Sequence, residues 1–439
     1  MQETKPTVLS ADEQRRGMRL VYIGQGVGVP FNQLLTASAF GVLLIKHMGG
    51  SDLQAMILAS LMLVTRFLQI PVSLLVPPER GKRFMLWCWS GCAMAMAAGL
   101  VATFLNIATI KVWLFLFCAT VGMMSLNCGT TFWFPLLHDV VPQRMRGRFF
   151  GRMRTVWNAT SFLAVVISGV FLGDEPAMWR YQVVLAVGLC MFLVRNVVIA
   201  QVPEARAPGH DDYANWKHYI RDILSRREVL VFCGYFSLLT FFSGFLTAPL
   251  VLYLERLGFP VGENILVYGG GMFGQILALI VAGVLTDRVG TKRVFAIAHV
   301  VLCVVCFCVV ALGFLPFAIA VVLMPIATTT CGAMLATAHV ACTVQLFHLA
   351  PDRGRAFFLS LGGILATGGM ALSPLLAGCI DELLGKGWGV MVFGMHMDLF
   401  QVIFVVAGIV MAVLMAGLYF VEDIQNEDVM CDRGLKAEG

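Results

Sequence analysis

The sequence contains few charged residues for its length. Only 13% of its 439 residues are Asp, Glu, Lys or Arg, while 59% are hydrophobic. Soluble domains carry about 25% charged residues, and one buried core cannot account for so large a deficit. This composition excludes an ordinary water-soluble protein and predicts that much of the apolar surface faces lipid.

Signature motifs of several other protein classes are also missing. No GxxxxGKS or GxxxxGKT phosphate-binding loop is present, so primary pumping would need a partner subunit. No loop combines paired acids, clustered histidines or a nucleophile, which argues against a membrane-embedded enzyme. The CxxCxC run at Cys303, Cys306 and Cys308 lies inside an apolar segment, where helix contacts are expected rather than metal ligands. We therefore expect no catalytic activity, no cofactor and no bound metal.

Long apolar stretches dominate what is present. A transmembrane helix needs roughly 20 apolar residues, and we find no short alternating segments of the kind that build membrane barrels. Residues 1–18 are polar, and the stretch after them is too long for a cleavable signal core, so we expect a retained first helix. Twelve candidate spans lie near residues 19–46, 52–76, 84–106, 111–138, 149–173, 179–201, 229–255, 263–286, 293–314, 316–347, 355–381 and 396–421.

Basic residues are distributed unevenly between the two sides of the predicted membrane. With both termini cytoplasmic, most of the 31 Lys and Arg fall in cytoplasmic segments, as the positive-inside rule requires. This bias predicts a multi-pass protein of an inner or plasma membrane with both termini in the cytoplasm. The basic cluster after span 4 is then a topological signal, and no nucleic-acid partner is expected. The cations left outside are Lys46, Lys111, Arg180, Arg256 and Lys386.

The chain divides into two similar halves. An Arg-Gly-Arg sequence begins at Arg146 after span 4 and again at Arg353 after span 10, and other loop features also recur about 210 residues apart. We therefore predict an all-α polytopic membrane protein with 12 transmembrane helices in two pseudo-symmetric six-helix bundles. Its parts are a cytoplasmic tail at 1–18, bundles at 19–201 and 229–421, a cytoplasmic linker at 202–228 and a cytoplasmic tail at 422–439.

Two loop motifs resemble signatures of the major facilitator superfamily. Residues 283–293, after span 8, read Gly-x-x-x-Asp-Arg-x-Gly-x-Lys-Arg, and an Arg-Gly pair follows a proline after span 4. The resemblance covers the whole chain and implies two bundles around a central cavity that opens alternately to each side. It also implies that spans 1, 4, 7 and 10 line this cavity and that spans 2, 5, 8 and 11 form the bundle interface. The implied gating motif comprises Gly283, Asp287, Arg288, Gly290, Lys292, Arg293, Arg146 and Gly147.

The first-half copy of the motif departs from this pattern. Residues 76–83 read Val-Pro-Pro-Glu-Arg-Gly-Lys-Arg, so two prolines intrude and the Asp-Arg pair is not in its usual register. Glu79 and Arg80 are the candidates to replace it.

Polar side chains at the middle of a span are costly and therefore informative. Each either contacts the substrate or bonds a neighbouring helix, which is worth about 1 kcal/mol. Substrate contact is the first interpretation for Asn32, Gln33 and Asn127, and helix bonding for Asn158 and Gln275, with both kept open. The predicted substrate-binding set is Asn32, Gln33, Arg66, Asn127, Asn158 and Gln275.

Arg66 is the most informative member of this set. A lone Arg at mid-depth costs about 3 kcal/mol even on a lenient insertion scale, and no Asp or Glu lies in the middle of any span. Arg66 therefore bonds backbone carbonyls, snorkels, or pairs with an anionic group of the substrate. Arg195 lies nearer the cytoplasmic edge, and we expect it to snorkel there.

Two further features allow a structural or a functional interpretation. Glycines precede Pro30 in span 1, where they serve close helix packing or loosen a cavity helix. Trp133, near the cytoplasmic end of span 4, is an aromatic-belt residue or a stacking platform for a sugar ring. The titratable candidates for proton coupling are His299, His339 and His348, and uniport or exchange is equally compatible with the sequence.

These observations predict a monomeric secondary active or facilitative transporter. It moves a small polar organic solute, neutral or anionic, by alternating access, and its partners are that solute and the lipid bilayer. One alternative is an exporter of amphipathic drugs, which the 24 Met and 32 Phe favour. Alternatives of another class are a membrane-embedded enzyme and a non-transporting sensor.

Overall fold

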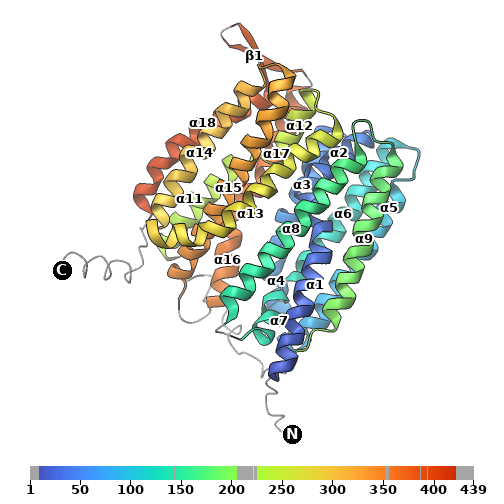
Figure 1. The fold of residues 1–439 in the computed structure, drawn as a ribbon, viewed down its shortest axis with the longest axis vertical. Helices are drawn as coiled ribbons and strands as arrows, with labels where there is room; N and C mark the ends of the chain where they lie inside the picture. The colour runs from blue at the N-terminus through green and yellow to red at the C-terminus, as the bar shows by residue number, and fades with distance from the viewer. Residues whose placement is uncertain are drawn as a thin grey trace, which may run out of the picture. The chain divides into compact units, whose positions relative to one another are not determined.

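The computed structural model shows a helical membrane protein (Figure 1). It describes residues 9–142, 145–204, 221, 225–351, 355–385, 387–392 and 394–421. Within this part of the chain, 11 helices are long and apolar enough to cross a membrane, or up to 12 if a bent pair counts as one span. Each predicted span corresponds to one of these helices or helix pairs, so the predicted fold class is confirmed.

The chain forms two compact units, Met1–Trp216 and Lys217–Gly439, and each holds six of the spans. Most of the predicted linker, including residues 205–220 and 222–224, lies outside the described residues, as does the predicted tail 422–439.

In the N-terminal unit, spans 1, 2 and 4 are each built from more than one helix. Span 1 is bent by 51° between its two helices. The elements are α1 (Ala11–Thr36), α2 (Ala39–His47), α3 (Asp52–Val64), the 3-10 helix η1 (Thr65–Leu68), α4 (Gln69–Leu75), η2 (Pro78–Arg80), α5 (Gly81–Ala102), α6 (Ala108–Thr130), α7 (Trp133–Val140), α8 (Arg146–Leu172) and α9 (Met178–Ala200).

The C-terminal unit adds a short β-hairpin between its last two spans. The strands β1 and β2 are antiparallel, and Met391 pairs with His396. The elements are α11 (Arg227–Gly244), α12 (Ala248–Arg256), α13 (Val261–Val289), α14 (Thr291–Leu312), α15 (Phe317–Leu349), α16 (Arg355–Thr367), α17 (Gly369–Leu384), β1 (Gly389–Val392), β2 (Met395–Asp398), α18 (Leu399–Leu414) and η5 (Met415–Phe420).

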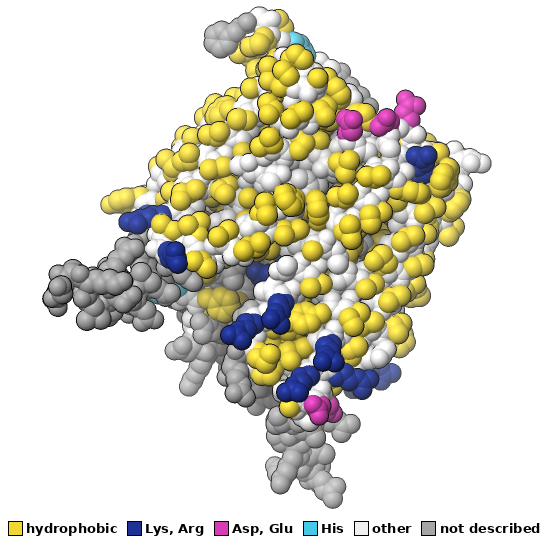
Figure 2. All heavy atoms as spheres, viewed as in Figure 1, with side chains coloured by type: hydrophobic (Ala, Val, Ile, Leu, Met, Phe, Trp, Pro, Cys, Tyr) yellow, Lys and Arg dark blue, Asp and Glu magenta, His cyan; other side chains and the backbone are white. Residues whose placement is uncertain are grey.

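Apolar side chains cover the sides of the helices. Met94 is 70% exposed and Ile280 is 73% exposed, although both are hydrophobic. Figure 2 shows hydrophobic side chains along the helices of the visible face, with Lys, Arg, Asp and Glu mainly near helix ends. Large apolar side chains also fill each unit, with Phe115 buried in the first and Phe295 in the second. This distribution suits a protein whose spans are surrounded by lipid.

The first helix begins at Ala11, inside the segment predicted as a tail. Ser10 caps it: the Ser10 hydroxyl accepts from the Glu13 amide at 3.3 Å, and the Glu13 carboxylate accepts from the Ser10 amide at 2.8 Å. This reciprocal capping box satisfies amide groups that a helix start otherwise leaves open. Residues 11–18 of the predicted tail therefore extend the helix of span 1.

The glycines of α1 allow close packing against two neighbouring helices. A Cβ at Gly24 would lie 2.6 Å from Ile199 of α9, and one at Gly26 would lie 3.0 Å from Val156 of α8. The helix continues through Pro30, and the bend of span 1 comes later, where Ser38 starts α2 by capping the amide of Phe40. Close packing therefore accounts for the glycines in this structure.

Candidate functional site

The predicted substrate-binding residues are spread over five spans. Asn32 and Gln33 lie on α1, Arg66 on η1, Asn127 on α6 and Asn158 on α8, all in the N-terminal unit. Gln275 lies on α13, in the C-terminal unit.

Span 2 changes from an α-helix to a 3-10 helix near its middle. α3 ends at Val64, η1 covers Thr65–Leu68, and α4 resumes at Gln69. Pro71 explains the position, because it lacks an N–H and its ring clashes with the carbonyl four residues earlier, which belongs to Phe67. Such a segment often marks a hinge. Pro71 is the sequence signal for this break, and a search for polar residues alone does not detect it.

Asn127 of α6 holds the interrupted span in place. Its Nδ2 donates to the Met62 carbonyl at 3.0 Å and to the Thr65 hydroxyl at 2.7 Å, and its Oδ1 accepts from Gln69 at 3.2 Å. In a regular α-helix the Met62 carbonyl would accept from the amide of Arg66. Asn127 is 1% exposed, and its amide is engaged by span 2. This geometry matches helix bonding, the alternative to substrate contact.

Arg66 lies in the 3-10 segment itself, next to this network. Its side chain is half-buried and, among the described residues, forms no hydrogen bond or ion pair. A guanidinium stays charged at any working pH and carries five N–H donors in a fixed fork. The break in span 2 therefore presents a cation that remains available to a ligand.

The other N-terminal candidates are placed differently. Asn32 is buried, and its Oδ1 has no partner among the described residues. Gln33 is half-buried. Asn158 donates to the Arg154 carbonyl of its own helix at 2.9 Å. No hydrogen bond within the described part of the unit joins these three to Arg66, so their role in binding stays a prediction.

Gln275 occupies the position in span 8 that corresponds to Arg66 in span 2, about 210 residues later. Span 8 is continuous there, and the Gln275 side chain is half-buried. The neighbouring glycines serve packing: a Cβ at Gly274 would lie 1.9 Å from the Thr329 carbonyl oxygen of α15. The two halves thus differ at this depth, with a broken span in the first and close helix contact in the second.

The predicted gating motif at residues 283–293 spans the end of α13 and the start of α14. A single residue, Gly290, connects the two helices. Gly290 has φ 87° and ψ 154°, a region that is essentially restricted to glycine. Its amide donates to the Thr286 carbonyl at 3.0 Å. Arg288 and Arg293 are exposed and Lys292 is half-buried. The side chains of Asp287 and Arg146, and the surroundings of Gly147, lie outside what the structure describes.

The altered first-half loop makes a contact of its own. Glu79 and Arg80 are exposed in η2, whereas Lys82 Nζ donates to the Val202 carbonyl, 2.5 Å away, just after span 6. A cation suits that position, because carbonyl groups are left open at the end of a helix. Burial raises the pKa of the nearby Glu204 carboxyl, and the charge of Lys82 acts in the opposite direction.

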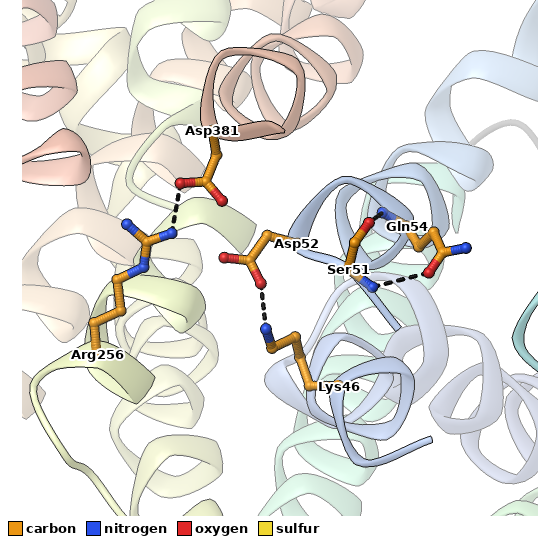
Figure 3. Close-up of polar contacts among 6 residues, drawn as sticks. All are labelled: Lys46, Ser51, Asp52, Gln54, Arg256 and Asp381. Carbon is orange, nitrogen blue, oxygen red and sulfur yellow. Dashed lines mark hydrogen bonds and ion pairs between the residues drawn. The ribbon is translucent and has the colours of Figure 1, made fainter. Parts of the chain in front are cut away.

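Two ion pairs each join the ends of two spans, at ends that the sequence predicts to lie on the outer side of the membrane. Lys46 pairs with Asp52 in the N-terminal unit, and Arg256 pairs with Asp381 at 2.5 Å in the C-terminal unit (Figure 3). Both carboxylates are buried. Lys46 and Arg256 occupy corresponding places, at the end of the first span of each half. Because breaking a buried pair strands a charge, each pair holds its two span ends together.

The candidate histidines lie in the C-terminal unit. His299 is 1% exposed, and its Nδ1 lies 3.3 Å from the Tyr235 hydroxyl and 3.1 Å from the Phe295 carbonyl oxygen. His339 Nδ1 lies 2.7 Å from the Leu335 carbonyl oxygen of its own helix, and His348 is exposed. Nothing in this geometry favours one of them for proton coupling.

The 11 candidate spans of the described residues, or 12 with the bent pair counted as one, define a multi-pass helical membrane protein. The chain belongs to the Major Facilitator Superfamily, because the model of that family matches residues 22–328 and 237–429. The predicted family is therefore confirmed, and the protein is a transporter and not an enzyme. A search of curated proteins found no match.

Solved structures of transporters share this fold. A mutant of the nucleoside transporter NupG is similar with a TM-score of 0.67 and 14% identity, over 93% of this chain and 100% of that chain. A D-xylose-proton symporter is similar with a TM-score of 0.67 and 15% identity, over 93% and 98%. A bacterial homolog of the human lysosomal transporter Spinster gives a TM-score of 0.61 and 15% identity, over 94% and 95%.

The Gly290 connection yields a stability prediction with a control in the same motif. Gly290→Ala should destabilise the protein by about 1–3 kcal/mol, because its backbone angles are strained for any L side chain. Gly283→Ala should be neutral or stabilising by about 0.5–1 kcal/mol, since no described atom lies within 4 Å of the added Cβ. Thermal unfolding of both variants in detergent tests this, and equal melting temperatures would contradict it.

The Asn127 network yields a second prediction. Asn127→Ala removes the donor to Met62 and Thr65 and should cost about 1–3 kcal/mol of unfolding free energy. The control is Asn158→Ala, which loses only a bond within its own helix and should change stability by less than about 0.5 kcal/mol. Unfolding curves in one detergent provide the measurement. A loss at Asn158 as large as that at Asn127 would show that the network does not brace span 2.

Proposed function

We propose that this protein is a secondary active or facilitative transporter of a small polar organic solute, and that Arg66 binds an anionic group of that solute. The observation that carries the proposal is the position of Arg66 in a break of span 2. Its guanidinium is half-buried there and has no ion pair within the described residues. A carboxylate or phosphate is the chemical complement of such a group, because both accept two parallel hydrogen bonds from the guanidinium fork.

The break in span 2 supports a moving part at this point. Alternating access requires spans to bend or tilt, and a 3-10 segment after a regular helix is a place where a span does so. Because Arg66 belongs to the segment, its position depends on the conformation of the break. A ligand held by Arg66 is thereby linked to the shape of span 2, and Asn127 positions the same segment from α6.

Proteins of similar fold support the solute class. The similar structures include transporters named for a nucleoside and for D-xylose, both of which are polar organic molecules. At 14–15% identity they are compatible with a polar solute, and the anionic group is argued from Arg66 alone.

Orientation and gating complete the proposal. The charge bias supports an inner or plasma membrane protein with both termini in the cytoplasm. The segment 283–293 then lies on the cytoplasmic side, where its charged residues break and remake contacts as the protein changes state. Arg288 and Arg293, which are exposed, are available for such contacts.

Variants of Arg66 test the substrate class. A thermal-shift screen of the purified protein against carboxylates, phosphates, sugars and nucleosides would first identify ligands. Arg66→Lys keeps the charge but loses the fork, and should weaken binding of an anionic ligand about tenfold. Arg66→Gln should weaken it further and leave the matched neutral amide or ester nearly unaffected. Equal losses for anionic and neutral ligands would mean that Arg66 is structural.

Cysteine labelling tests the orientation. Asn215→Cys, in a variant freed of its native cysteines, should react with an impermeant maleimide only after the membrane is opened. Lys111→Cys, at the predicted outer end of span 4, should react in intact cells and serves as the control. The reverse pattern would overturn the orientation.

A further inference from the structure

Arg195 is buried within the N-terminal unit instead of reaching the membrane edge. It lies on α9 and is 5% exposed. Its guanidinium carbon lies 3.9 Å from the centroid of the Trp89 ring of α5 and 5.4 Å from that of Phe192. The predicted snorkelling is therefore wrong: the side chain turns onto an aromatic face inside the unit.

The sequence provides the space for this side chain at Gly28. A Cβ at Gly28 would lie 2.1 Å from Cδ of Arg195, so no other residue at this position of α1 leaves room for it. α1 packs against α9, and α9 against α5, as Figure 1 also shows. Arg195 therefore occupies a slot built from three spans.

Polar groups on α1 and α9, the two helices that meet at Gly28 and Arg195, lack partners among the described residues. Nε and Nη1 of Arg195 are buried, and neither has a hydrogen-bond partner among the described residues. The same holds for Nε2 of Gln25 and for both side-chain polar atoms of Asn196. Gln25 lies three residues, about one helical turn, before Gly28 on α1, and Asn196 follows Arg195 directly on α9. Buried polar atoms are almost always paired in native proteins, so this grouping points to a ligand.

The missing partner is an acceptor with negative charge. Arg195 stays protonated in any protein environment, and no ion pair forms with it in the described part of the chain. Trp89 offers only its quadrupole, which compensates a buried charge incompletely. The unpaired donors are two from the guanidinium and two from side-chain amides, Gln25 Nε2 and Asn196 Nδ2. Such a set matches a small anion that accepts several hydrogen bonds.

We propose that Arg195, Gln25 and Asn196 form an internal anion site in the N-terminal unit, which holds a halide or a small carboxylate. This site does not include Arg66, which lies on another span. The proposal can be tested independently of the proposed substrate contact, because binding of an inorganic anion is measured without transport. A halide would be a resident or co-transported ion. A carboxylate would be a second small ligand, distinct from the solute proposed to bind at Arg66.

Halide titration of the full-length protein tests the site. The protein is purified with the bulky sulfonate HEPES as the only anion, and chloride, bromide, iodide or acetate is added at constant ionic strength. We expect a saturable rise in melting temperature, and saturable quenching of tryptophan fluorescence by iodide, because the ion would lie next to Trp89. Saturation by halides alone indicates an inorganic ion, and saturation by acetate with displacement of iodide indicates a carboxylate.

Variants separate this site from general salt effects. Arg195→Gln should abolish the saturable response, and Arg195→Lys should weaken it by about tenfold. Gln25→Leu keeps the charge and removes one donor, so it should weaken binding several-fold even if the arginine variants fail to fold. The matched control is Arg180→Gln, since Arg180 also lies over a tryptophan ring, that of Trp179, but is half-buried at the start of α9 and donates to the Leu172 carbonyl at 2.8 Å. It should respond as the wild type does.

Two results would overturn the proposal. One is the absence of a saturable response to any halide and to acetate in the wild type. The other is a response that Arg195→Gln or Gln25→Leu leaves unchanged. In either case Arg195 is held by Trp89 and internal water alone.

Discussion

Hydrocarbon offers no hydrogen bonds, and this constraint governs the whole structure. Every backbone amide and carbonyl within the bilayer must find a partner inside the protein. Long helices satisfy it by themselves, and where a helix is interrupted a side chain has to supply the missing partner. Asn127 does so for the Met62 carbonyl at the break in span 2. Because an unpaired carbonyl within the bilayer is costly, this hydrogen bond stabilises the packing of α6 against span 2.

The two halves of the chain use this constraint differently. In the first half, span 2 carries Pro71 and breaks, and polar side chains gather around the interruption. In the second half, the corresponding span 8 stays helical and lies so close to α15 that glycine is required at Gly274. The two halves therefore share the same order of spans, while the residues at the middle of spans 2 and 8 differ. A transporter built this way carries its cation in the first half, at Arg66, and an uncharged amide at the corresponding Gln275.

Arg66 and Arg195 are arginines within spans whose side chains have different surroundings. Arg66 is half-buried in a 3-10 segment and keeps its donors free within the described residues. Arg195 is almost fully buried and lies flat on Trp89, with Gly28 making the room. The first arrangement suits a ligand that comes and goes with the conformation of span 2. The second suits an ion that stays with the unit, because three packed spans enclose it.

The sequence alone determined the all-α class, the spans, the internal repeat and the family, because each depends on local properties: apolar length, charge placement and short loop motifs. It did not determine which neighbour each polar group meets, since that depends on the rotation of one helix against another. Only the tertiary structure decided that Asn127 bonds span 2, that Trp133 packs on Trp89 rather than in an aromatic belt, and that Arg195 turns inward. For Arg195 the deciding partner is Gly28, a residue on a different span whose only contribution is the absence of a side chain.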